Sequence, residues 1–201
     1  MPETLASLKA KVFEITKRPE LDSLTSQAVK LAVARAHQTD FFHRDAAILP
    51  LTYANLGNQF VEIPNIYDQA PRLRTPNFLL GEDVLTGSGI EKLGFIQDAK
   101  NLWDENLALK SSVFTLIGET LRARFAQPTG RASLYHYVNP DVSNSGFRSW
   151  IADAHPDEIA QWAAAIVWAR SGNLDQAKAS MDMTVIPFKD LLVSSYLLEK
   201  I

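Results

Sequence analysis

The sequence predicts an α+β protein in which a helical bundle formed by both chain ends carries an inserted antiparallel β-rich middle. Two observations indicate this fold. Near both ends, apolar residues recur every three or four positions, which is the period of a helix with a buried face. Between about residues 45 and 138 the period changes to two, which is typical of strands. The predicted domains are a helical bundle of residues 1–43 and 147–201 and a β-rich domain of residues 44–146.

The N-terminal segment is predicted to form two helices. Thr4 is a suitable cap for the first, and the Arg18-Pro19 pair marks its end, because proline cannot continue a helix. The second helix begins at residue 22 or 23 and fades near residue 39. Their apolar stripes contain Leu5, Leu8, Val12 and Ile15 in the first helix, and Leu24, Ala28 and Leu31 in the second.

The middle of the chain predicts an antiparallel sheet of about five or six short strands. Residues 81–94 contain four glycines and therefore indicate a loop or wide turn. A short helix is expected around Trp103. The segments that alternate in polarity are 48–53, 59–63, 72–74 with 77–80, 113–117, 120–125 and 132–138.

The C-terminal third predicts a helical hairpin. Pro156 suits the first position of a helix, because its missing N–H would have no partner there. This helix is apolar on nearly all sides as far as Arg170, which predicts burial on more than one side. Gly172 is the expected stop, and Asn173 then caps a second helix that ends or kinks near Pro187.

Composition narrows the functional classes. The chain has 201 residues, a formal net charge of −3 and no cysteine. A dedicated nucleic-acid binder normally carries a basic excess. The lack of thiols excludes disulfides, thiolate metal sites and a cysteine nucleophile. No apolar run reaches membrane-spanning length, and the N-terminus has no signal-peptide pattern. We therefore expect no membrane contact. We expect a cytoplasmic protein, or one that is carried within a larger particle.

The densest group of metal-ligand residue types is His37, Asp40, His43 and Asp45. His37 and Asp40 share a helix face, but His43 lies beyond the expected helix end. A zinc or iron site needs three or more converging ligands. A polar helix end leading into a turn accounts for the group, so we expect no metal. A small metal-dependent hydrolase using His37, Asp40 and His43 is the alternative from the enzyme class.

Other catalytic and binding motifs are incomplete. Gly87-Ser88-Gly89 is not followed by the Gly-Lys-Ser/Thr of a phosphate loop, and no Gly-x-Ser-x-Gly is present. We therefore expect a protein that is not an enzyme, with no catalytic residue and no cofactor. Alternating arginines suggest a basic strip that faces DNA or an acidic partner, with a solvated outer sheet face as the alternative. The residues of this strip are Arg72, Arg74, Arg122 and Arg124.

The helical ends also carry a family resemblance in four segments. They are Leu5-x-x-Leu8 through Arg18-Pro19-Glu20-Leu21; Ala34-Arg35-Ala36-His37 with Asp40-Phe41-Phe42; Tyr137 and Pro140 with Ser149-Trp150-Ile151-Ala152-Asp153, Pro156 and Ile159; and the Gly172 break with Ala177. Together they resemble the head-to-tail adaptor (connector) proteins of tailed bacteriophages, particularly those of short-tailed phages. The similarity covers roughly half of the chain and consists of packing motifs.

This resemblance implies a structural virion protein at the neck, assembled in the host cytoplasm. Such adaptors form a ring, here expected to have about twelve copies, between the portal protein and the tail tube or nozzle. The ring extends the channel through which genome DNA passes without sequence-specific binding. Another neck or tail component, such as a tail terminator, is the alternative within this class.

The resemblance also implies that the C-terminal segment reaches the portal. This segment is apolar, which suits docking into a groove. Packing of a last helix on its own bundle is the alternative. The implied portal-contact residues are Phe188, Leu191, Leu192, Tyr196, Leu197 and Leu198.

Overall fold

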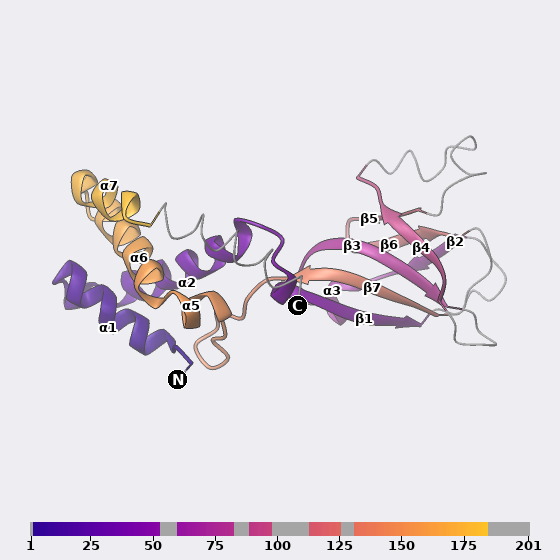
Figure 1. Ribbon diagram of the computed structural model, residues 1–201, viewed down its shortest axis with the longest axis horizontal. Helices are drawn as coiled ribbons and strands as arrows, with labels where there is room; N and C mark the ends of the chain where they lie inside the picture. The colour runs from indigo at the N-terminus through magenta and orange to yellow at the C-terminus, as the bar shows by residue number, and fades with distance from the viewer. Residues whose placement is uncertain (1, 53–59, 83–88, 98–112, 126–130, 185–201) are drawn as a thin grey trace. The chain divides into compact units, whose positions relative to one another are not determined.

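The computed structural model describes residues 2–52, 60–82, 89–97, 113–125 and 131–184. Contacts divide the chain into two compact units, one of residues 1–45 with 139–201 and one of residues 46–138 (Figure 1). We call them the helical unit and the sheet unit. Each has its own hydrophobic core. No helix in the described ranges is both long and apolar enough to cross a membrane.

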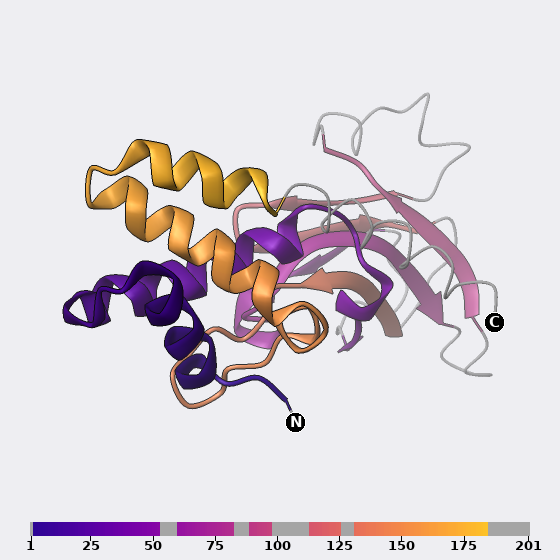
Figure 2. The same ribbon diagram turned by 60° about the vertical axis from the view of Figure 1, so that its left-hand side comes forward.

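In the helical unit, α1, α2 and α6 supply most of the core, and α7 packs against α6. The helix α6 contacts α1, α2 and α7, so it is covered on several sides, as its apolar faces predict. Figure 2 shows α6 and α7 running side by side as a hairpin. The helices are α1 (Leu5–Thr16), α2 (Asp22–Gln38), α5 (Trp150–Ala154), α6 (Pro156–Arg170) and α7 (Leu174–Asp182), with 3-10 turns at Pro19–Leu21 and His43–Asp45.

Local capping signals explain where these helices begin and end. Thr4 forms a capping box with Ser7, which satisfies two N–H groups at the start of α1. Gly172 separates α6 from α7 in the left-handed conformation, with φ of 84°. The Asn173 side chain then accepts a hydrogen bond from the Gln176 N–H and caps α7. These predicted boundaries are confirmed. The predicted end near Pro187 lies outside the described residues.

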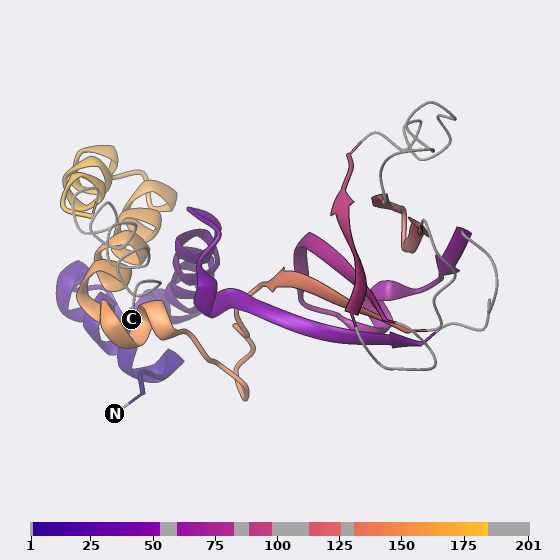
Figure 3. The same cartoon turned by 45° about the vertical axis from the view of Figure 1, so that its right-hand side comes forward.

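In the sheet unit, seven strands form one curled sheet in the order β1-β7-β3-β4-β5-β6-β2 (Figure 3). Its inner face packs on a core that includes Leu79, Phe114 and Leu134, with the short helix α3 (Ile66–Gln69). The strands are β1 (Ala46–Thr52), β2 (Phe60–Ile63), β3 (Leu73–Glu82), β4 (Gly89–Phe95), β5 (Val113–Ile117), β6 (Thr120–Arg124) and β7 (Arg131–Val138).

The predicted fold class, a helical bundle formed by both chain ends with an inserted antiparallel β-rich middle, is wrong. The protein is a mixed α+β fold whose seven-stranded sheet curls into a half-barrel with a core of its own. The sheet is also not purely antiparallel, because β4 and β5 pair in parallel. Parallel neighbours need a long connection, and alternation along one strand does not reveal its neighbour's direction.

The loop predicted for the glycine-rich stretch is a further wrong prediction. The predicted loop at residues 81–94 overlaps the end of β3 and most of β4. Gly94 lies in a regular strand, paired with Phe78 across the sheet. Glycine weakens a strand but does not prevent the backbone from pairing there. The short helix predicted around Trp103 lies outside the described residues.

Candidate functional site: a closed polar network and two apolar surfaces

Three polar side chains from distant parts of the sequence meet inside the helical unit. His37 lies in the last turn of α2, Asp45 ends the turn before β1, and Ser149 is the N-cap of α5. The His37 Nδ1 atom is 2.9 and 2.8 Å from the two carboxylate oxygens of Asp45. Its Nε2 atom is 2.9 Å from Ser149 Oγ. All three residues are buried, with exposed fractions of 2%, 4% and 6%.

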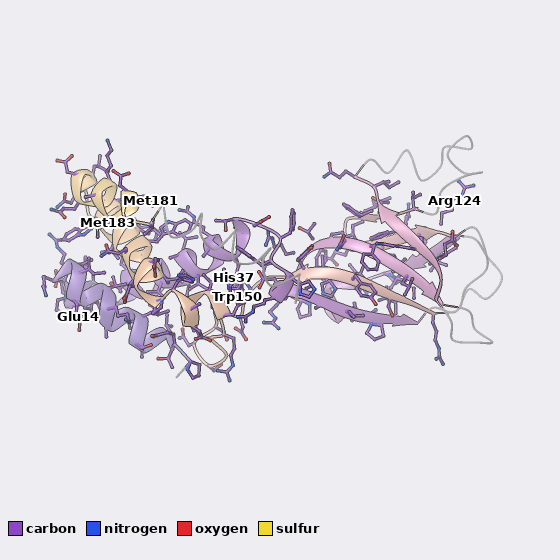
Figure 4. The ribbon with its side chains drawn as sticks, in the orientation of Figure 1. Glu14, His37, Arg124, Trp150, Met181 and Met183 are labelled. Carbon is purple, nitrogen blue, oxygen red and sulfur yellow. The ribbon has the colours of Figure 1, made fainter. Side chains whose placement is uncertain are left out.

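Trp150 closes this network on the Asp45 side. Its indole Nε1 donates a hydrogen bond of 2.8 Å to Asp45 Oδ1. The ring packs edge-on against His37 and Phe42, with centroid separations of 5.8 and 5.1 Å, and Figure 4 shows His37 and Trp150 side by side. The Arg44 guanidinium lies 5.4 Å from the indole centroid. The Asp45 carboxylate is therefore surrounded by hydrogen-bond donors and rings instead of water.

The partners assign the protons of neutral His37. The Asp45 carboxylate can only accept, so Nδ1 carries the proton that it receives, and Nε2 accepts from the Ser149 hydroxyl. This Asp–His–Ser order is also that of a serine-hydrolase triad. However, Ser149 Oγ already accepts the Ala152 N–H at 3.0 Å as a helix cap. A nucleophile must also reach its substrate, and Ser149 is buried. The network as described fixes three segments and does not present a nucleophile.

The residues predicted as alternative metal ligands do not converge. His37 meets Asp45 and Ser149, whereas Asp40 Oδ1 accepts the N–H of Phe41 at 2.7 Å and His43 is exposed. Among the described residues, no group of three or more histidines, aspartates or glutamates is placed to hold a metal ion. Sequence reasoning missed the role of Ser149, which it named only within the segments that carry the family resemblance. The distance of 112 residues from His37 hides this contact from local patterns.

The four arginines of the predicted basic strip lie in two groups. Arg72 directly precedes β3 and Arg74 lies in it, whereas Arg122 and Arg124 are on β6. Figure 4 labels Arg124. Two strands, β4 and β5, separate them in the sheet. The Arg122 Nε atom is 2.8 Å from a carboxylate oxygen of Glu62 on the neighbouring edge strand. The structure therefore does not bring the two pairs together.

A groove between α1 and α6 is lined by charged side chains that include Lys11, Glu14 and Asp157. The Lys11 ammonium is 2.7 Å from Asp157 Oδ1, and this hydrogen bond raises the pKa of Lys11. The Asp157 side chain is 82% exposed, so water screens the pair. Ligand sites generally combine an enclosed apolar wall with a few convergent polar groups, which this open groove lacks.

Exposed apolar side chains gather on the last described helix of the helical unit. Leu174 and Met181 lie two turns apart on one side of α7, with exposed fractions of 70% and 38%. Met183 follows the helix end and is 65% exposed. Figure 4 shows the two methionines close to the end of α7. We call Leu174, Met181 and Met183 the α7 apolar surface.

The sheet unit has a second, partly exposed apolar surface on the face opposite to its core. Strand pairing aligns Ile48 of β1, Tyr135 of β7 and Phe78 of β3 in one row across the sheet. The next row contains Pro50, Ser133, Leu80 and Lys92. Successive side chains point to opposite faces, and the intervening Leu134 and Leu79 are buried in the core. We call the outer surface of Ile48, Pro50, Phe78, Leu80 and Tyr135 the outer aromatic face.

Comparison of the chain with protein-family models finds no match. Comparison with curated proteins finds no significant match either.

Proposed function

We propose that this protein is a head-to-tail adaptor of a tailed bacteriophage, a structural virion protein that forms a ring between the portal and the tail. The observation that carries the proposal is the contrast between a buried polar network and apolar side chains at the surface. The His37 network is buried, whereas the α7 apolar surface is exposed and the outer aromatic face is partly exposed, through Ile48 and Pro50. Large exposed apolar side chains in a folded protein indicate contacts with other proteins.

The family resemblance of the helical segments supports the same proposal. The resembling segments supply Leu8 and Val12 of the helical core, and also His37, Ser149 and Trp150 of the buried network. They therefore specify how the helical unit is packed. A shared pattern in such positions argues for a shared helical scaffold and not for a shared reaction.

The proposed partners are the portal protein, the tail tube or nozzle, and further copies of the same chain. The ring extends the channel for genome DNA, which passes without sequence-specific contacts. Its place is the virion neck, after assembly in the host cytoplasm. The segment proposed to contact the portal, from Phe188 to Leu198, lies outside the described residues, and four residues separate it from the α7 apolar surface in the sequence.

The solution mass of the protein, alone and with purified portal from the same phage, tests the proposal. We expect a ring-sized complex when the portal is present, measured by light scattering or native mass spectrometry. A Leu192→Asp, Leu197→Asp double variant is expected to lose this complex, because charges at an apolar contact oppose docking. A chain that stays monomeric and never binds the portal would contradict the adaptor function.

A parallel binding measurement separates the adaptor from a tail terminator. An adaptor is expected to bind the portal before any tail protein is added. A terminator is expected to bind the end of an assembled tail tube and to ignore the isolated portal. Binding only to the tail tube would identify the protein as a tail terminator instead of an adaptor.

A further inference from the structure

We draw no further inference here: the strongest candidate, the partly exposed apolar patch around Ile48 and Pro50 on the outer face of the seven-stranded sheet, carries none because nothing in the structure shows what covers it.

Discussion

At the scale of single residues, the helical unit depends on polar groups that satisfy one another out of water. The Asp45 carboxylate accepts hydrogen bonds from His37 and Trp150, and His37 also meets Ser149. Removing one member leaves another buried group without its partner. Such losses cost more than the net stabilisation of an ordinary hydrogen bond, because the orphaned group has also lost its hydration.

The variant His37→Ala is expected to lower the free energy of unfolding by about 2–4 kcal/mol, because it leaves the Asp45 carboxylate buried with one donor fewer. His43→Ala is the matched control, since His43 is exposed six residues away, and a change within about 0.5 kcal/mol is expected. Urea unfolding followed by circular dichroism measures both. Equal losses in the two variants would show that the network does not stabilise the unit.

The buried hydroxyl of Thr25 differs from the His37 network, whose polar groups satisfy one another. Thr25 is fully buried in α2, and its Oγ1 has no hydrogen-bond partner within the described part of the chain. Thr25→Val is therefore expected to raise the free energy of unfolding by about 1 kcal/mol, because an unsatisfied polar atom is replaced by a methyl group. Thr16→Val is the control, because Thr16 Oγ1 donates to the Val12 carbonyl at 2.9 Å, and no gain is expected. A gain in both variants would contradict this explanation.

At the scale of elements, α6 is the centre of the helical unit, and several alanines lie on its buried surface. Ala160, Ala163 and Ala164 are at most 1% exposed, while α1, α2 and α7 all contact this helix. Alanine lets neighbouring helices approach closely and has the best helix propensity. The same feature makes the packing sensitive to added volume.

Ala163→Leu is expected to lower the free energy of unfolding by about 1–3 kcal/mol, because the extra atoms meet a filled core. Ala169→Leu adds the same atoms at an exposed position of the same helix, so a change within about 0.5 kcal/mol is expected. Thermal unfolding followed by circular dichroism compares them. If Ala163→Leu is as stable as the parent protein, α6 is not packed as described.

Sequence patterns predicted the elements that local chemistry determines. Thr4, Gly172 and Asn173 mark helix ends through hydrogen bonds or backbone angles within a few residues, so a short window contains the whole signal. β4 was missed because its glycines resemble a loop, although Leu93 is buried and Gly94 pairs with Phe78. The parallel contact of β4 with β5 has no local signal at all.

The candidate sites depend on contacts between residues that are distant in the sequence, as the parallel strand pair does. The outward row of Ile48, Phe78 and Tyr135 depends on register among three strands that are distant in sequence. The contact of His37 with Ser149 depends on the return of the chain after the sheet. Neither was predicted, because no motif spans such separations. The arginine pairs were predicted as one strip because alternation indicates a face of one strand but not the distance between strands.

At the scale of the whole molecule, the two units have separate cores, and the chain passes between them twice. A single cooperative transition is not guaranteed when two cores exist. We expect heat unfolding in two steps, so the calorimetric enthalpy should exceed the van't Hoff enthalpy. In Ala163→Leu, hydrogen exchange should accelerate in α6 and remain unchanged in β7. Uniform acceleration in both elements would show one cooperative unit instead.

The separation of α2 from α6 in the sequence has a consequence during synthesis. α2 ends at residue 38 and its partner α6 begins at residue 156, so 117 residues lie between them. At roughly 5–20 residues per second, a ribosome needs about 6–24 s to make this stretch. During that interval the apolar side of α2, which includes Val29 and Val33, is not yet covered by α6. The nascent chain is therefore expected to need protection from aggregation until α6 has emerged.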